Sequence, residues 1–144
     1  MHETEKTIAG SHVLVTGFGR IGKVICRTFA NMDAFVTAAA RKSADLAMAE
    51  VCGYKAVKTS CLSSVKKADI IVNTVPYPII KEDFLNVLSP NTLLIESASK
   101  PGGFDRNAVE KLGLKIIDAP GLPGKVAPVT AGEIIGRTAV SIIN

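Results

Sequence analysis

The chain has 144 residues, of which 47% are hydrophobic and 21% are charged, and its formal net charge is +4. This length and composition predict one folded domain with a buried core, and they exclude a disordered chain and most complete two-domain enzymes. The sequence has no tryptophan and only 5% aromatic residues, which argues against the aromatic surfaces that bind single-stranded nucleic acid. Because the positive charge is mild and contains no run of five like charges, we expect no nucleic-acid partner.

Apolar segments alternate with helical patterns from one end of the chain to the other. The segments that predict strands are 12–16, 34–40, 54–57, 69–75, 92–97 and 114–118. The segments that predict helices are 20–32, 44–52, 81–88, 105–112 and 131–143, with a helical turn or two at 62–67. Ser43 is the expected N-cap of the second helix, and Gly53 and Gly113 are expected to end two of the helices.

Strands that alternate with helices predict a parallel sheet covered on both faces, and the nearly continuous apolar character of the strands supports this. The predicted fold is therefore α/β, a Rossmann-like, doubly wound, six-stranded parallel sheet in three layers (αβα) with strand order 3-2-1-4-5-6. We expect residues 1–10 to be a polar leader or linker and residues 11–144 to form the domain. No apolar stretch reaches the roughly 18 residues that a membrane span requires, so no membrane partner is expected.

The three cysteines carry information about the compartment and about metals. Cys26, Cys52 and Cys61 form no CxxC pair and have no histidine nearby, so no metal site is predicted. Cys26 and Cys52 fall among apolar residues on predicted helices, which favours reduced thiols buried in the core. An odd number of cysteines without a signal peptide indicates a reducing, cytoplasmic compartment.

Residues 17–22 read GFGRIG, which matches the GxGxxG pattern of dinucleotide-binding loops. The pattern follows the first predicted strand and opens the first predicted helix, which is the context that the motif requires. Its glycines suit a tight turn, a close approach of a pyrophosphate, and close packing of helix on strand, in that order. The alternative is a glycine-rich turn that binds no ligand. The cofactor-binding residues that the motif predicts are Gly17, Gly19, Arg20, Ile21 and Gly22.

The residues after the second predicted strand bear on the choice between NAD and NADP. NAD sites usually carry an acidic residue there, which binds the ribose 2′-hydroxyl. The corresponding residue in this chain is Arg41, and Lys42 and Ser43 follow it. A guanidinium, an ammonium and a hydroxyl suit a 2′-phosphate, so NADP is favoured as the cofactor, with NAD as the other choice. The alternative is an exposed basic pair that contacts no cofactor.

In open parallel sheets, ligands bind outside the carboxyl ends of the strands, which directs attention to the three remaining loops there. The loop after the fourth strand is expected beside the adenosine or the central ribose, and the loop after the fifth near the nicotinamide. The loop after the sixth is rich in proline and glycine, which suits a shaped active-site wall. For each loop, a plain connector is the alternative. The cofactor-binding residues predicted in these loops are Thr74, Val75, Pro76, Ser97, Ala98, Ser99 and Gly121.

Few residues of the sequence suit catalysis. Lys100 and Lys125 are the catalytic candidates, because an ammonium group can bind a carboxylate substrate. Glu96 ends an apolar strand, which favours a hydrogen-bonded position in the core over a reactive one. A structural role remains the alternative for all three residues. No Ser-His-Asp arrangement can be placed.

Five motifs of the chain carry a resemblance to a known family. They are GFGRIG, AAARKS, DIIVNTVP, ESASKPGGFD and DAPGLPGKVAPVTAGEII. Together they are similar to the C-terminal domain of the dipicolinate synthase A subunits, and the last two motifs are the specific ones. The entry VLVTGFGRIGKVICRTFA also resembles the cofactor domains of D-2-hydroxyacid dehydrogenases and adenosylhomocysteinases. The resemblance covers nearly the whole chain after the leader.

The resemblance implies an NAD(P)-dependent oxidoreductase that oxidises a dihydrodipicolinate-type precursor to dipicolinic acid during sporulation. It implies a small dicarboxylate substrate, a flavoprotein-like B subunit of dipicolinate synthase as partner, and the mother-cell cytoplasm of a sporulating bacterium as compartment. A homo-oligomer is compatible with it. Members of the family carry an N-terminal substrate domain, which we expect to be absent from this chain, so the isolated domain is expected to turn over poorly.

Two other functions stay open at this point. One is a nucleotide-sensing regulatory domain without chemistry, of the kind found on potassium transporters, although such domains usually carry an acidic residue where this chain has Arg41. The other is the cofactor domain of an enzyme like the D-2-hydroxyacid dehydrogenases. That family has a catalytic arginine after the fifth strand, where this chain offers Lys100, and a downstream catalytic histidine that this sequence lacks.

Overall fold

The computed structural model of the chain describes residues 7–119, 136–137 and 139–141. Its strands are β1 (His12–Thr16), β2 (Phe35–Ala40), β3 (Lys55–Lys58), β4 (Ile70–Asn73), β5 (Leu93–Glu96) and β6 (Lys115–Asp118). Its helical elements in this part of the chain are α1 (Arg20–Ala30), α2 (Ser43–Val51), the 3-10 helix η1 (Thr59–Ser64), α3 (Glu82–Leu85) and α4 (Arg106–Leu112). Helical connections therefore alternate with strands, as the sequence pattern predicts.

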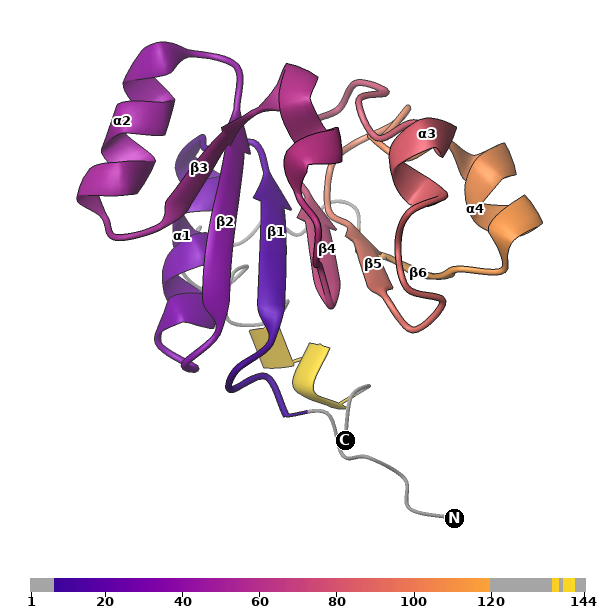
Figure 1. Ribbon diagram of the computed structural model, residues 1–144, viewed down its shortest axis with the longest axis horizontal. Helices are drawn as coiled ribbons and strands as arrows, with labels where there is room; N and C mark the ends of the chain where they lie inside the picture. Colours follow the sequence, from indigo (N-terminus) through magenta and orange to yellow (C-terminus); the bar gives the residue numbers. More distant parts are fainter. Residues whose placement is uncertain (1–6, 120–135, 138, 142–144) are drawn as a thin grey trace.

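The six strands form one parallel sheet in the order β3-β2-β1-β4-β5-β6, which confirms the predicted topology (Figure 1). The chain builds the sheet outward from β1 to β3 and then continues on the other side from β4, so the order reverses between β1 and β4. Thr16 pairs with Asn73, and Asn73 pairs with Glu96, so the carboxyl ends of three strands lie level. Doubly wound sheets bind ligands at such a reversal.

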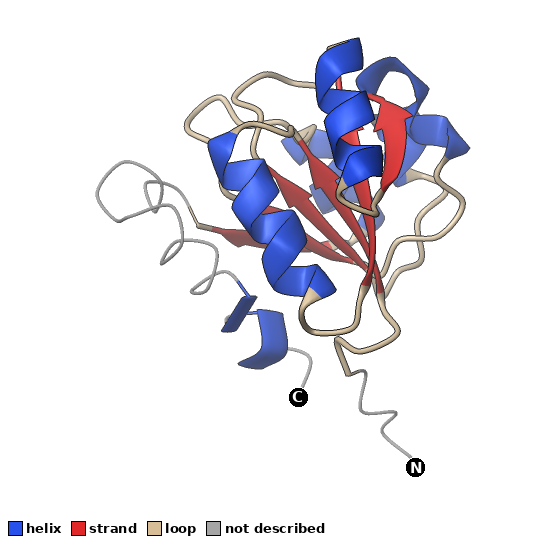
Figure 2. Ribbon diagram, turned by 90° about the vertical axis from the view of Figure 1, so that its left-hand side faces the viewer, coloured by secondary structure: helices blue, strands red, loops and turns tan. Residues whose placement is uncertain are grey.

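Successive side chains of each strand point to opposite faces of the sheet, and each face has its own apolar core. Val13 and Val15 of β1 pack with Phe29 of α1 in the core on the α1 and α2 side. Leu14 packs with Phe84 of α3 in the core on the side of α3 and α4. The sheet is therefore the middle of three layers, a Rossmann-like α/β fold (Figure 2).

Most element boundaries lie within two residues of the predicted ones, and two differences have a clear physical cause. β4 ends at Asn73 and not at residue 75, because the Asn73 side chain accepts from Val75 N (3.1 Å) and donates to Val75 O (2.8 Å), which closes a turn. The expected N-cap role of Ser43 was wrong, because Lys42 has the extended backbone that precedes the helix (φ −88°, ψ 136°). Ser43 is instead the first residue of α2.

The cysteines differ in their exposure. Cys26 of α1 is buried, as predicted, and burial raises the pKa of its thiol from the ordinary 9.0 to about 12. Cys52 is exposed, so the prediction of a buried thiol at this position was wrong. Cys52 follows the last residue of α2, and the chain turns away from the helix at Gly53 (φ +87°). Cys61 is also exposed.

Several predicted features lie wholly or partly outside the described residues. These include the leader up to residue 6 and the loop after β6, with Gly121 and Lys125. Within the predicted helix 131–143, residues 136–137 and 139–141 are described and are helical, and Ala139 packs into the core on the α1 side. Among the described residues, none of the helices has both the length and the apolar character needed to cross a membrane.

Candidate functional site

The glycine loop, residues 17–22, joins β1 to α1 and is shaped by two glycines. Gly17 has a φ of +93°, a conformation that other residues rarely adopt, and a Cβ there would lie 2.3 Å from Thr74 Oγ1. A Cβ on Gly22 would lie 1.9 Å from the carbonyl oxygen of Gly17. Gly17 and Gly22 therefore allow the loop to turn tightly and α1 to lie close against it.

Gly19 differs from the other two glycines of the motif, because nothing lies within 4 Å of the place that its Cβ would occupy. Gly19 is also the N-cap of α1, where no side chain caps the helix and no acidic residue occupies the first turn. The first N–H groups of a helix have no partner inside it, and the helix dipole makes this end attractive to anions. The open space at Gly19 therefore fits a pyrophosphate group lying against the backbone.

Hydrogen bonds fix the glycine loop between the ends of β2 and β4. Gly17 N donates to Ala39 O at 2.8 Å, which ties the loop to β2. Thr74 ties it to β4, because Thr74 N and Thr74 Oγ1 both donate to Thr16 O, at 2.9 Å and 2.7 Å. The predicted residue Thr74 thus holds the glycine loop in place. Val75 is half-buried beside it, and Pro76 is exposed.

The basic segment, residues 41–43, follows directly after β2. It begins two residues after Ala39, whose carbonyl oxygen accepts the hydrogen bond from Gly17 N. Arg41, Lys42 and Ser43 are all exposed, and no described residue forms an ion pair or a side-chain hydrogen bond with them. Their polar groups are therefore available to a ligand at this corner of the sheet. A guanidinium can hold a phosphate through two parallel hydrogen bonds.

A buried polar network joins the carboxyl ends of β1, β4 and β5. The Glu96 side chain is 3% exposed and accepts from Asn73 Nδ2 (2.6 Å), Ala98 N (3.1 Å) and Gly103 N (2.8 Å). Asn73 is fully buried and in turn accepts from Thr16 Oγ1 at 2.6 Å. The expectation that Glu96 is hydrogen-bonded in the core is confirmed, and its carboxylate holds the backbone that follows β5.

The loop after β5 is wrapped closely around this network. A Cβ on Gly102 would lie 2.7 Å from Glu96 Oε2, and one on Gly103 would lie 2.4 Å from Asn73 Nδ2. Ser97 is buried and donates from its hydroxyl to Asn73 O at 2.7 Å. Of the predicted residues in this loop, Ser97 and Ala98 are buried, whereas Ser99 and the catalytic candidate Lys100 are exposed.

Asp118 ends β6 at the same edge of the sheet and pairs with Arg106 of α4. Two hydrogen bonds join the guanidinium to the two carboxylate oxygens, a bidentate arrangement. Arg106 lowers the pKa of Asp118, and the pKa of Arg106 is raised in return, mainly by the same hydrogen bonding. The carboxylate of Asp118 therefore stays charged and engaged, which suits a structural role.

The structure brings together the glycine loop and Thr74, and it brings Ser97 and Ala98 to the neighbouring strand end. Sequence reasoning missed Asn73, which joins Thr16, Val75 and Glu96. A signal was present in the sequence, because the glycine pair at 102–103 follows a carboxylate that ends an apolar strand. Closely packed glycines near a buried charged group indicate backbone that wraps around it.

The family model for the NAD-binding domain of D-isomer specific 2-hydroxyacid dehydrogenases matches residues 1–110. The chain belongs to this family. It is therefore a member of an oxidoreductase family whose shared domain binds a nicotinamide cofactor, and the glycine loop lies inside the matched region.

Known proteins similar to the chain include the A subunits of dipicolinate synthase from two Bacillus species. The A subunit of dipicolinate synthase from Bacillus subtilis is 45% identical over 138 residues, which are 95% of this chain and 46% of the relative. The crystal structure of the B. subtilis protein superposes with a TM-score of 0.79 at 44% identity, covering 98% of this chain and 48% of that one. The structure of the same subunit from Bacillus halodurans gives 0.80 at 37% identity, covering 98% and 49%. The chain thus spans about half the length of these relatives.

Proposed function

We propose that the chain is the cofactor-binding part of the A subunit of a dipicolinate synthase, and that it binds a nicotinamide dinucleotide at the head of α1. The observation that carries this proposal is the contrast within the glycine loop. Gly17 and Gly22 are required by packing, whereas the space at Gly19 is open beside the uncapped start of α1. The 45% identity to the B. subtilis A subunit supports the choice of enzyme within the family.

NADP is the cofactor that the polar groups after β2 favour. The pyrophosphate would lie on the N–H groups of Gly19, Arg20 and Ile21, and the 2′-phosphate would be held by Arg41, Lys42 and Ser43. The adenosine or central ribose would lie against residues 74–76. NAD remains the other cofactor to test, since a free guanidinium can also contact a 2′-hydroxyl.

The proposed reaction is the oxidation of a dihydrodipicolinate-type precursor to dipicolinic acid. The substrate ring gives up one hydride to the nicotinamide and one proton to a base or to water, and it becomes aromatic. The chemistry of hydride acceptance belongs to the cofactor. Residues of the chain position it, with the nicotinamide near Ser97, Ala98, Ser99 and Gly121, and with Lys100 and Lys125 as candidates to bind the substrate carboxylates.

The rest of the proposal concerns what surrounds this domain. Residues 11–144 would form the cofactor-binding domain after a leader or linker at 1–10, of which Ile8 is buried in the core on the α1 side. A separate substrate domain would complete the cleft, which fits the coverage of about half of each relative. Because the relatives are named as one subunit of a synthase, a flavoprotein-like B subunit is the proposed partner, alongside a homo-oligomer. The compartment is the mother-cell cytoplasm of a sporulating bacterium.

Titration with NADP and NAD tests the cofactor assignment. We expect NADP to bind the chain more tightly than NAD. Arg41→Ala should lower the affinity for NADP about tenfold and change the affinity for NAD little, because only the contact with the 2′-phosphate is lost. Arg27→Ala, which removes an exposed arginine near the other end of α1, is the matched control and should change neither affinity. Equal affinities that Arg41→Ala leaves unchanged would overturn the assignment.

A further inference from the structure

Asn73, the last residue of β4, has every hydrogen-bonding position of its side-chain amide occupied. Its Oδ1 accepts from Thr16 Oγ1 (2.6 Å) and from Val75 N (3.1 Å). Its Nδ2 donates to Val75 O (2.8 Å) and to Glu96 Oε1 (2.6 Å). An amide has two donor hydrogens and an oxygen with two lone pairs, so these four bonds use all of them. We propose that Asn73 is a positioning residue for the cofactor, which couples the glycine loop to the loop after β5, and this role rests on the proposed cofactor site.

On one side, Asn73 acts on the glycine loop through the turn that its side chain closes. Thr74 lies inside this turn, and both Thr74 N and Thr74 Oγ1 donate to Thr16 O. The next residue, Gly17, packs so closely on Thr74 that a Cβ there would lie 2.3 Å from Thr74 Oγ1. Packed groups of this kind have no room to absorb a shift. A displacement of the turn at residues 73–75 is therefore transmitted to the start of the glycine loop.

On the other side, Asn73 acts on the loop after β5 through Glu96. The oxygen that accepts from Asn73 Nδ2 also accepts from Ala98 N, and the other oxygen accepts from Gly103 N. The backbone of Asn73 adds a second connection, because Asn73 O accepts from Ser97 N (3.0 Å) and from Ser97 Oγ (2.7 Å). The start and the end of this loop thus depend on the same residue of β4.

The segments after β4 and β5 are joined again farther along the chain. Gly103 O accepts from Ile79 N (3.1 Å) and Ile80 N (2.8 Å), and Ile80 forms a parallel bridge with Phe104. Ile80 and Phe104 are both buried. Coupling between separate sites is carried by such contiguous networks of hydrogen bonds and packed side chains. A change at Asn73 should therefore reach both loops of the proposed cofactor site.

Position 73 needs a side chain that accepts and donates at the same time. A carboxylate oxygen such as Glu96 Oε1 can only accept, so its partner must donate, whereas Val75 N requires an acceptor. Arg106 of α4 interacts electrostatically with Glu96, but its guanidinium is engaged by Asp118. A second buried carboxylate at position 73 would therefore share one proton with Glu96 at pH values at which an exposed carboxyl has lost it.

Asn73→Asp tests the coupling without a ligand, by amide NMR between pH 4.5 and pH 8. The protonated carboxyl can donate to Glu96 Oε1 as the amide does, and loss of the shared proton should drive the two side chains apart. We expect the amides of residues 17–19 and those of Ala98 and Gly103 to shift with one common midpoint. The control Asn91→Asp, at an exposed position, should show no such midpoint.

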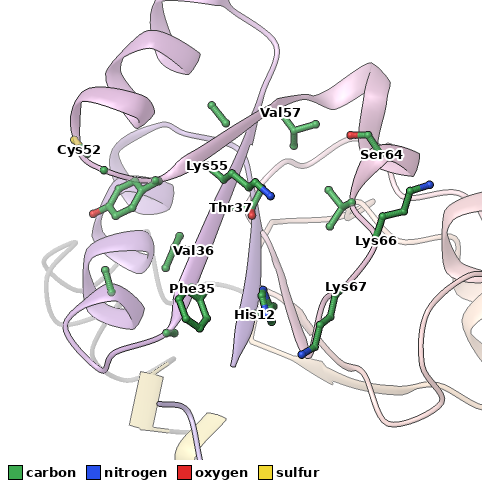
Figure 3. Close-up of a pocket in the computed structure, with 16 residues that line it drawn as sticks. His12, Phe35, Val36, Thr37, Cys52, Lys55, Val57, Ser64, Lys66 and Lys67 are labelled. Carbon is green, nitrogen blue, oxygen red and sulfur yellow. The ribbon is translucent and has the colours of Figure 1, made fainter. Parts of the chain in front are cut away.

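The same spectra contain an internal reference far from this network. A cavity of about 660 Å³ is lined by residues around the β2–β3 edge, and none of its lining residues belongs to the network (Figure 3). The amides of Lys55 and Lys66, which line this cavity, should titrate identically in the wild type and in Asn73→Asp. A difference there as large as in the two loops would show a general loss of structure and would overturn the specific role of Asn73.

Binding of a cofactor fragment measures the coupling in the wild type. Adenosine 2′,5′-bisphosphate has the groups that the glycine loop and residues 41–43 would hold, but it has no nicotinamide. We expect it to shift the amides of Ala98 and Gly103 as well as those of residues 17–22, because a coupled loop responds to a ligand bound at the other. In Asn73→Asp above its midpoint, the shifts at Ala98 and Gly103 should be lost. The affinity of this variant for NADP should fall about tenfold or more through the midpoint, relative to the wild type at the same pH.

Several results would overturn the coupling. One is a folded Asn73→Asp in which the two loops titrate with different midpoints, or in which residues 17–19 do not titrate. Another, which does not depend on the folding of any variant, is a wild type whose glycine loop binds the bisphosphate while Ala98 and Gly103 stay unshifted. If neither the bisphosphate nor NADP binds, that result counts only against the proposed function, because the pH titration uses no ligand.

Discussion

The Glu96 carboxylate shows how one buried residue organises the carboxyl edge of the sheet. Three donors from β4 and from the loop after β5 converge on its two oxygens. No described residue forms an ion pair with it, although Arg106 interacts with it electrostatically. Such a group stabilises the loop only while every donor remains satisfied. The geometry of the loop beside the proposed nicotinamide position therefore depends on a residue that lies beneath it.

Replacing the carboxylate by an amide tests this role. Glu96→Gln keeps the shape of the side chain but replaces one acceptor oxygen by an NH2 donor. If Oε1 is replaced, Asn73 Nδ2 and Ala98 N lose their bonds to residue 96, and if Oε2 is replaced, Gly103 N loses its bond. We expect the free energy of unfolding to fall by about 1–3 kcal/mol in urea denaturation. Glu110→Gln, an exposed position on α4, should stay within about 0.5 kcal/mol of the wild type. A change in Glu96→Gln no larger than in that control would contradict the account.

The buried thiol of Cys26 predicts a dependence of stability on alkaline pH. Its pKa is about 12 in the folded chain against the ordinary 9.0, so above pH 9 the unfolded chain loses this proton first. Stability is therefore unaffected below pH 9 and falls as the pH rises toward 12, by up to about 4 kcal/mol at full titration. Unfolding measured between pH 8 and pH 10.5 should show a smaller loss in Cys26→Ala than in the wild type. Cys61→Ala, with an exposed thiol that does not act on Cys26, should lose as much as the wild type.

At the scale of elements, the strands and helices could be predicted because each depends on a pattern of neighbours a few residues apart. Their alternation then predicted the order of the strands in a doubly wound sheet. The polar network was harder to predict from the sequence, since Asn73 lies 57 residues from Thr16 and 23 from Glu96. The predictions of a buried Cys52 and of Ser43 as the N-cap of α2 were wrong for a related reason. Both depend on where a helix turns at its ends, and boundaries are set by local backbone bonds that composition does not reveal.

The junction of β1 and α1 gives a prediction that separates packing from binding. Gly22→Ala places a methyl group against the Gly17 carbonyl, so it should lower the free energy of unfolding by about 1–3 kcal/mol. Gly19→Ala enters open space, so stability should change little while NADP affinity falls about tenfold or more, because the methyl occupies the pyrophosphate position. Thermal unfolding and cofactor titration of both variants check this. Equal cofactor affinity in Gly19→Ala and the wild type would contradict the role given to Gly19.

At the scale of the whole molecule, the chain has a complete doubly wound sheet and the topological reversal at which such sheets bind dinucleotides. Its length is about half that of the dipicolinate synthase relatives, and we propose that the reaction also uses surfaces outside these 144 residues. The fold supports many reactions, and the choice of substrate depends on the site as a whole. We propose that cofactor binding is the part of this function that these residues perform by themselves.

Mapping of the NADPH site by amide NMR on the labelled chain tests the central claim most directly. We predict that the largest shifts fall on residues 17–22 and 41–43, with smaller ones at 74–75 and 97–99, and that Gly19→Ala weakens all of them together. Saturable binding with its largest shifts elsewhere, or no binding to a folded chain at millimolar NADPH and NADH, would contradict the account.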